Sequence, residues 1–310
     1  MHCHTKEGSL DGKVPISEYI NILKSQGYGG MLVTDHDSYD GYRYWKHNIK
    51  NVDKDFVVFK GIEYDTLDAG HIIVIMPENL KLRLMELRGM PVQLLIPIVH
   101  NYGGILGPAH PFGEKFMSFM NSKAYKRNPD ILSEFDFIEV FNACESKMAN
   151  DKALEMAEKY NLTGTAGSDS HKTESIGYAY TVIPDEIRKE SQLIEYIKHR
   201  NKTEFGGKIY ENTSRGKLGK AKIITTYLFW IYNKFGGWSR GIQRNGKLKK
   251  GYIERIDIID NDKKENKDKK DKKSKKEKKD QKDKKPNKFI ETIKKKWLIN
   301  GTKTLILVLI

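Results

Sequence analysis

Short apolar runs alternate with amphipathic stretches over the first two hundred residues, and this alternation limits the folds that the chain can adopt. Seven runs are predicted to be strands, at residues 30–34, 56–63, 72–76, 105–109, 137–141, 164–167 and 179–183. Four segments are predicted to be helices, at 16–26, 92–100, 148–160 and 190–199. This pattern is typical of a mostly parallel, barrel-like α/β domain, in which functional side chains lie at the C-terminal ends of the strands.

The charge of the chain is divided between two regions. Residues 1–197 contain 21 Lys and Arg against 28 Asp and Glu, whereas residues 198–310 contain 34 against 13. The net charge of +14 therefore comes entirely from the C-terminal third. This division predicts two functional regions and argues against one uniformly basic protein.

The chain has two cysteines, Cys3 and Cys144, which excludes a disulfide framework and favours a reducing compartment. No basic stretch followed by an apolar run marks a signal peptide, so a cytoplasmic location is expected.

The C-terminal third is predicted to fold little. Residues 206–260 form a basic extension whose apolar run, 228–232, is too short to span a bilayer. Residues 261–288 contain 15 Lys, 7 Asp or Glu and no apolar side chain, which predicts a disordered linker. The apolar segment 289–310 is either an amphipathic or docking helix or a truncated membrane segment.

A histidine pair, His2 and His4, stands at the start of the chain. Alternate residues of an extended strand share a face, so both imidazoles can bind one ion of Zn, Mn or Fe. Two exposed histidines are the alternative. Asp11 follows on a loop and is either a further ligand or an ordinary turn residue.

His36 stands between Asp35 and Asp37, in a cluster that follows the predicted strand 30–34. Packed carboxylates repel one another unless a cation or hydrogen bonds compensate, so His36 is expected to be a metal ligand. Asp35 or Asp37 is expected to orient His36 or a neighbouring ligand.

Glu63 ends an apolar strand, so it is expected to be partly buried and to need a partner. Its two carboxylate oxygens can bridge two cations. The short connection to His71 favours a hairpin that returns His71 to the same end. The alternative is a strand-initiating histidine bonded to the backbone.

Two further clusters follow strands. Pro111 forces a turn directly after His110, and Asp169 and His171 alternate after the strand 164–167. The remaining histidines are His47, His100 and His199. His47 and His199 are interpreted as solvated side chains, and His100 as a capping residue for which a ligand role stays open.

The motifs HCHT, SLDG, TDHD, GIEYDT, AHP and GSDSH follow in this order within residues 1–205. Together they resemble the polymerase and histidinol phosphatase (PHP) family of metal-dependent phosphoesterases, and its short stand-alone subgroup most of all. No nucleophile elbow, Gly-rich phosphate loop or CxxC pair points to another chemistry.

The resemblance implies a distorted (β/α)7 barrel over residues 1–205, with the basic and largely disordered extension after it. In the family the HxH pair ends a first strand, which is nearly absent before His2, so a truncated or open barrel edge is expected. The family holds two or three Mn, Zn or Fe ions. The implied ligands are His2, His4, Glu63 and Asp169 for one metal, Glu63 and His110 with His71 for a second, and Asp11, His36 and His171 for a third.

The implied activity is the hydrolysis of phosphate esters by a metal-activated hydroxide. Glu63 would bridge the metals, and His36 or His171 would stabilise the leaving alkoxide. A phosphomonoester, a nucleotide and an oligonucleotide end all fit as substrate. Lys6, Lys115 and Lys172 are either phosphate contacts or ordinary surface lysines.

The basic tail could bind either nucleic acid or an anionic membrane. In the second case the C-terminal segment would associate the chain with the membrane. The oligomeric state stays open. Two other function classes also remain: a non-catalytic, basic-tailed binding or scaffold protein with a degraded barrel, and an amidohydrolase-like C–N hydrolase.

Overall fold

The computed structural model describes residues 1–50, 55–80, 83–113, 117–199 and 202–211, together with Leu228, Ile231, Tyr232, Phe235 and Ser239. The chain divides into two compact units, Met1–Ile258 and Ile259–Ile310, and the described residues all belong to the first. The predictions for 261–288 and 289–310, and most of that for 206–260, lie outside the described residues.

Eight strands form three sheets in the described part of the chain. The strands are β1 Gly30–Val33, β2 Val57–Asp65, β3 His71–Ile75, β4 Ile105–Pro108, β5 Phe137–Asn142, β6 Thr163–Gly167, β7 Ala179–Val182 and β8 Glu204–Gly207. All seven predicted strands are confirmed, with bounds that shift by at most two residues, whereas β8 was not predicted. The sheets have the orders β1-β2-β3-β4, β5-β6 and β7-β8.

The strand directions differ from the expectation. β1–β2 and β5–β6 are parallel, but β3 runs antiparallel to both β2 and β4, and β7–β8 is antiparallel. The prediction of a mostly parallel arrangement is therefore wrong, because the short connection between β2 and β3 makes a hairpin. That hairpin itself was predicted, and it pairs Asp65 with His71. The described strands do not form one closed sheet.

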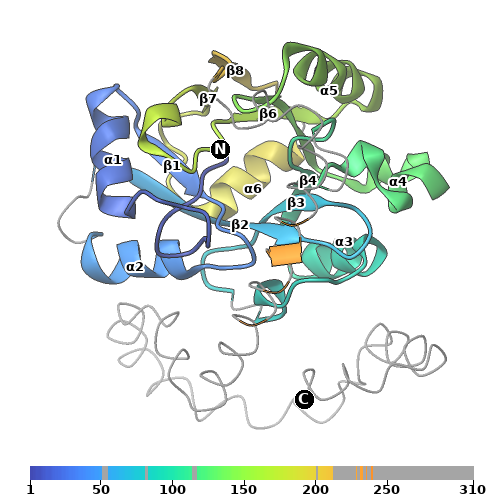
Figure 1. Cartoon of the computed structure of the whole chain (residues 1–310), viewed down its shortest axis with the longest axis horizontal. Helices are drawn as coiled ribbons and strands as arrows, with labels where there is room; N and C mark the ends of the chain where they lie inside the picture. Colours follow the sequence, from blue (N-terminus) through green and yellow to red (C-terminus); the bar gives the residue numbers. More distant parts are fainter. Residues whose placement is uncertain are drawn as a thin grey trace, which may run out of the picture. The chain divides into compact units, whose positions relative to one another are not determined.

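Six α-helices surround the strands among the described residues. They are α1 Ile16–Ser25, α2 Asp40–Asn48, α3 Val92–Asn101, α4 Lys123–Arg127, α5 Lys147–Tyr160 and α6 Glu190–Lys198. The four predicted helices are confirmed to within one residue, and α2 and α4 were not predicted. Figure 1 shows α1 and α2 on one side of the strands and α3, α4 and α5 on the other, with α6 among the strands. No helix in the described ranges is both long and apolar enough to cross a bilayer.

Successive side chains of β1 point to opposite faces of the sheet, and both faces are packed. Met31 and Val33 point into a cluster with the buried stripe of α1, whereas Leu32 points into a second cluster with α6. Both faces of β1 are thus covered, as its continuous apolar sequence predicts. Because β1 pairs in parallel with β2, its last residue, Val33, lies opposite Lys60, and His36 beyond it bridges to Glu63.

The segment with His2 and His4 ties the ends of β1 and β6 together. The Thr34 amide donates to the Cys3 carbonyl (3.0 Å), and Cys3 forms a parallel bridge with Ser170 after β6. The Asp169 amide donates to the His2 carbonyl (3.0 Å). Although this segment is short, backbone hydrogen bonds on both sides hold it between the ends of β1 and β6.

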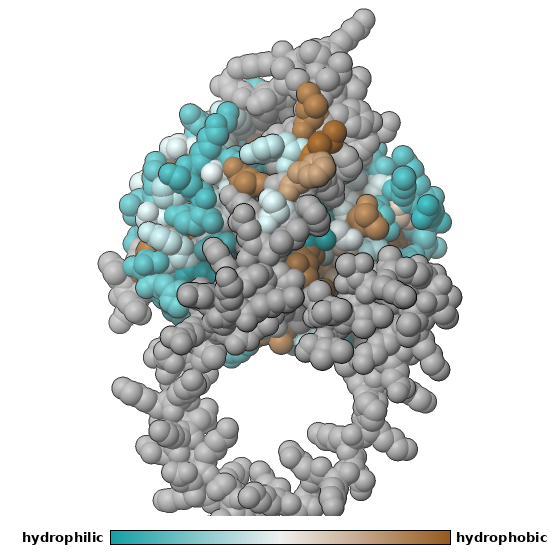
Figure 2. Space-filling model, turned by 60° about the horizontal axis from the view of Figure 1, so that its bottom comes forward, coloured by the Kyte–Doolittle hydropathy of each residue, from teal (hydrophilic) through white to brown (hydrophobic). Residues whose placement is uncertain are grey.

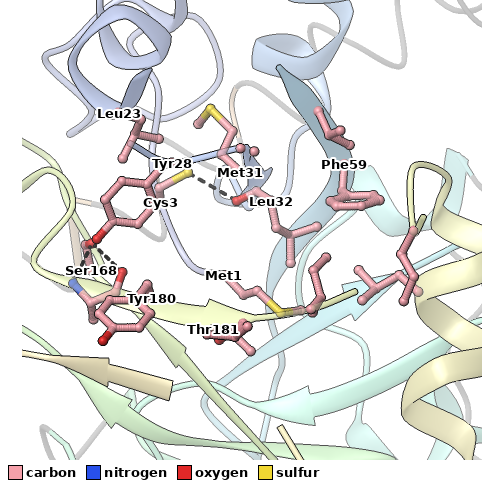
Figure 3. A pocket seen from close by; sticks show the side chains of 18 of the residues that line it. Met1, Cys3, Leu23, Tyr28, Met31, Leu32, Phe59, Ser168, Tyr180 and Thr181 are labelled. Atoms are coloured by element: carbon pink, nitrogen blue, oxygen red, sulfur yellow. Dashed lines mark hydrogen bonds between the residues drawn. The ribbon is translucent and has the colours of Figure 1, made fainter. Parts of the chain in front are cut away.

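A cavity of about 530 Å³ lies beside this segment, between β1 and β7. Figure 3 shows Met1 and Thr181 among the residues that line it, and the Cys3 thiol donating to the Leu32 carbonyl (3.1 Å). Of the nine predicted metal ligands, only His2 lines the cavity, so the predicted site lies elsewhere.

The surface is mostly polar over the described ranges. In Figure 2 hydrophilic side chains cover the flanks of the domain, and a few hydrophobic side chains gather near the middle of the view. Exposed large apolar residues near the C-terminal end of the described part are Leu228, Ile231, Tyr232 and Phe235.

Candidate metal centre

The nine predicted ligands meet in one cluster. They come from the N-terminal segment (His2, His4), the loop before α1 (Asp11), the ends of β1, β4 and β6 (His36, His110, Asp169, His171) and the β2–β3 hairpin (Glu63, His71). Each is thus placed by a strand end, by the hairpin or by a loop that hydrogen bonds hold to these ends.

Glu63 is the centre of the cluster. Its side chain is 1% exposed. Its carboxylate oxygens lie close to a ring nitrogen of five histidines: His2 (3.4 Å), His4 (3.3 Å), His36 (3.0 Å), His71 (2.9 Å) and His110 (3.0 Å). The backbone fixes this position, because the Glu63 amide donates to Asp35 and the Glu63 carbonyl accepts from Asp37.

The surrounding charges fix the protonation of Glu63. Burial alone would raise its pKa, but the nearby imidazoles, those of His71 and His36 first, hold the pKa well below its ordinary value. Burial also disfavours the charged form of His36, yet Glu63 and Asp11 raise the pKa of His36 well above its ordinary value. Without a cation, protons on the imidazoles therefore balance the carboxylate.

Asp11 and Asp169 extend the cluster. Asp11 Oδ2 lies 3.3 Å from His171 Nε2 and 3.6 Å from His36 Nε2. Asp169 Oδ1 lies 3.3 Å from His4 Nε2 and 3.8 Å from His171 Nδ1. Burial opposes ionisation of both carboxyls, but the neighbouring histidines hold their pKa values well below the ordinary range.

His4 presents an unprotonated ring nitrogen, Nε2, to the carboxylates of this cluster. Ser9 Oγ donates to Asp35 (3.0 Å), so it accepts from His4 Nδ1 (3.1 Å) and leaves His4 Nε2 without a proton. That bare nitrogen lies 3.3 Å from carboxylate oxygens of both Glu63 and Asp169. Burial and the repulsion of nearby imidazoles lower the pKa of His4 to about 3, so it stays neutral. A cation between these atoms would relieve the repulsion.

Two buried carboxylate oxygens also indicate that a cation fits in the cluster. Asp11 Oδ1 is buried and accepts no hydrogen bond from any described residue, and Glu63 Oε2 faces the unprotonated His4 Nε2 (3.3 Å) as well as His36 Nδ1 (3.0 Å). Leaving such an atom without a partner costs about 1–3 kcal/mol. Imidazole nitrogens with carboxylate oxygens are the donor set that Zn, Mn and Fe accept. The residues present therefore fit divalent metal ions.

Three groups of ligand atoms are compact enough to hold one ion each: His2, His4 and Asp169; His36, Glu63 and His71; and His4, His36 and His171. The first group matches the set implied for one metal, apart from Glu63. The second group keeps Glu63 and His71 of the set implied for the second metal and has His36 in place of His110. The third group keeps His36 and His171 of the set implied for the third metal and has His4 in place of Asp11. The His71 ring thus lies in the cluster, although its backbone amide also donates to Met117.

Strained backbone surrounds the ligands. Of the four non-glycine residues with positive φ in the described ranges, three belong to this region: Asp37 (46°), His110 (28°) and Asp169 (47°). Such conformations persist only where surrounding contacts impose them, and they concentrate at functional sites. At Asp37 one such contact is the ion pair with Arg88 Nε (3.0 Å), and Arg88 also pairs with Asp65 (2.6 Å).

Three residues of the site were missed by the sequence interpretation: Ser9, Glu139 and Asn142. Glu139 is 1% exposed and lies 3.0 Å from His2 Nδ1. A charged residue inside the apolar strand FIEVF was the same signal that identified Glu63, so Glu139 could have been found. Of the lysines considered as phosphate contacts, Lys6 and Lys172 are exposed, and Lys115 lies outside the described residues.

Comparison with known proteins gives one match to a family model and several related chains. Residues 147–201 match the family described as PHP-associated. A protein of uncharacterised function from Methanocaldococcus jannaschii, MJ0417, is 28% identical over 151 residues, which cover 44% of this chain and 61% of that protein. The chain thus spans less than two thirds of the length of this relative.

Several solved structures are similar to this chain at low sequence identity. PsfC from Pseudomonas syringae PB-5123 has a TM-score of 0.50 and 16% identity, over 76% of this chain and 96% of PsfC. A putative metal-dependent phosphoesterase from Bifidobacterium adolescentis has a TM-score of 0.47 and 13% identity, over 64% and 95%. The lesion-specific endonuclease PfuEndoQ from Pyrococcus furiosus has a TM-score of 0.46 and 19% identity, over 66% and 56%. The family-model match covers residues 147–201, which include the motif GSDSH, and this match confirms the resemblance to the PHP family that the sequence motifs indicate.

Proposed function

We propose that this chain is a metal-dependent hydrolase of phosphate esters. The observation that carries the proposal is the position of Glu63, a buried carboxylate with nitrogens of five histidines no more than 3.4 Å away. Such a cluster is unfavourable without a cation, because its imidazoles must either repel one another as cations or point lone pairs at carboxylates. Bound divalent ions would supply Lewis acidity, lowering the pKa of water and neutralising phosphate oxygens.

The exposure of the ligands indicates where a substrate would enter. The side chains of His2, His4, Glu63 and His110 are at most 4% exposed, whereas those of His171, Asp11 and His36 are 29%, 19% and 17% exposed. A phosphate ester would therefore approach the side formed by Asp11, His36 and His171. His171 is the most exposed of these histidines, so it would lie nearest to the bound ester and its leaving alkoxide oxygen.

We extend the proposal to the details of the metal site and of the fold. The ligand sets, two or three ions of Mn, Zn or Fe, and a closed (β/α)7 barrel are all implied by the PHP resemblance. A phosphomonoester, a nucleotide or an oligonucleotide end fits the open side equally. The cluster offers no feature that favours cleavage of a C–N bond or a purely structural role.

A panel of phosphate esters tests the proposal. The purified chain is assayed with p-nitrophenyl phosphate, nucleotides and 5′- or 3′-phosphorylated oligonucleotides in the presence of Mn²⁺. We expect hydrolysis of at least one class, its loss in excess chelator and its return with added Mn²⁺. Full activity in excess chelator would show that the cluster does not work through metals.

Metal affinity should rise with pH. Charged neighbours raise the pKa values of His36 and His171 despite the opposing effect of burial, so both rings of the metal-free site hold a proton at pH 6, which lies below the ordinary pKa of about 6.5. An incoming ion must displace these protons, and the affinity should rise about tenfold per pH unit for each proton displaced. Calorimetric titration of Zn²⁺ in buffers of different ionisation enthalpy measures the proton release directly. Zero release at pH 6 would contradict the assignment of these histidines as ligands.

A further inference from the structure

A carboxylate that is not among the nine predicted ligands contacts three parts of the cluster. Glu139 lies on β5, and its Oε1 is 3.0 Å from His2 Nδ1. Its Oε2 accepts hydrogen bonds from the His110 amide (2.7 Å) and from Asn142 Nδ2 (3.0 Å). None of the compact ligand groups among the described residues includes Glu139.

We propose that Glu139 is a positioning residue that holds His2, His110 and, through Asn142, Asp169 in the geometry that binds metal. This role rests on the proposed metal-dependent function. It concerns one carboxylate that orients ligands from three different segments without touching the metal itself.

The contact with His2 selects which ring nitrogen is available. An ionised carboxylate only accepts hydrogen bonds, so the proton of a neutral His2 must lie on Nδ1. The free Nε2 then faces His4 Nε2 (3.2 Å), Glu63 (3.4 Å) and Asp169 (3.7 Å). A carboxylate behind a metal-binding histidine fixes ring orientation and raises the basicity of the ligand nitrogen.

The contacts of Oε2 fix two strained residues. His110, whose amide donates to Glu139, has φ of 28°, and Asp169, at 47°, accepts from Asn142 Nδ2 (3.2 Å). This hydrogen bond occupies Asp169 Oδ2 and leaves Oδ1 facing His4 (3.3 Å). The ends of β4 and β6 are thereby tied to β5 through Glu139 and Asn142.

The close approach of His2 and Glu139 depends on a glycine. A side chain at Gly167, the last residue of β6, would collide with the His2 Cβ and would reach Glu139 Oε1. Gly167 therefore leaves room for the histidine and the carboxylate to meet in a space that any larger residue would fill.

The variant Glu139→Gln separates positioning from packing. Its shape is nearly unchanged, and its amide oxygen can still accept from His110 and Asn142. The amide nitrogen then faces His2 Nδ1 and donates to it, which moves the His2 proton to Nε2 and blocks the ligand atom. We expect Zn²⁺ affinity to fall about 10- to 100-fold, the usual effect of removing such a supporting carboxylate.

A matched control is Glu190→Gln. Glu190 is also buried (4% exposed), and it accepts from the Lys60 amide (2.7 Å) and contacts none of the nine ligands. Its change to Gln should leave Zn²⁺ affinity unaltered. Asn142→Ala is the second test variant, and it should weaken Zn²⁺ binding about tenfold while retaining the contact between Glu139 and His2.

The experiment titrates Zn²⁺ into the full chain and its variants and records ¹⁵N spectra of histidine-labelled, Zn²⁺-loaded protein. Thermal unfolding confirms that each variant is folded. In the wild type we expect His2 to bind Zn²⁺ through Nε2 with its proton on Nδ1, and in Glu139→Gln we expect this signature to disappear. If Glu139→Gln does not fold, the decision rests on Asn142→Ala.

The outcomes distinguish the two proposals. Wild-type protein that binds no Zn²⁺ overturns the proposed function together with this role. Wild-type protein that binds Zn²⁺ while Glu139→Gln and Asn142→Ala bind it equally well overturns the role of Glu139 alone. An affinity loss as large in Glu190→Gln would likewise contradict positioning, because it would reflect a general effect of removing a buried carboxylate.

Discussion

Replacing Glu63 with Gln should lower kcat/KM for a phosphate ester more than about 100-fold, which exceeds the usual effect of losing a residue that only supports a ligand. The charge at the centre of the cluster is lost, while the shape is retained. An amide offers one oxygen, and its NH₂ group must point at one or more of the five histidines around Glu63. The measurement is steady-state kinetics with Mn²⁺, together with the metal content of the variant.

Glu190→Gln again serves as the control, since it removes a buried carboxylate away from the cluster. Both variants should remain folded, as followed by circular dichroism. Near wild-type kinetics for folded Glu63→Gln would show that the carboxylate at the centre of the cluster is not needed for activity.

Divalent ions should stabilise the folded chain strongly. The cluster joins the N-terminal segment, the β2–β3 hairpin and the ends of β1, β4 and β6, so an ion bound there ties distant parts of the sequence together. At a free concentration 100 times Kd, binding adds about 2.7 kcal/mol to the free energy of unfolding. For a domain of this size the melting temperature should rise by about 5–10 °C.

Differential scanning fluorimetry with Mn²⁺ or Zn²⁺, after removal of metal with chelator, measures this shift. Glu63→Gln should show a much smaller shift than the wild type. An unchanged melting temperature across a wide range of Mn²⁺ and Zn²⁺ concentrations would argue that neither ion binds the native state.

Strand ends were the features that the sequence revealed best. His36, His110 and Asp169 each follow an apolar run, and the structure brings them together because β1, β4 and β6 end at the same cluster. The hairpin that carries Glu63 and His71 was predictable from its short connection. These inferences needed only local sequence, since a strand's end and its direction in a hairpin are set locally.

Features that depend on tertiary contacts were not predictable in the same way. Ser9 is an ordinary loop serine in the sequence, and its role comes from Asp35, 26 positions away. β8 has the sequence EFGG, which lacks the alternation of a typical strand, and it forms by pairing with β7. The direction of β4 relative to β3 follows from packing and not from the residues of either strand.

The number of metal ions bound per chain tests the central claim most directly. Purified wild-type protein is loaded with Mn²⁺ or Zn²⁺, dialysed and measured by inductively coupled plasma mass spectrometry, with Glu63→Gln treated in parallel. Two or three ions per wild-type chain and a clear reduction in the variant are the predicted result. Wild-type protein that retains no divalent ion at micromolar free metal would contradict a metal centre built around Glu63.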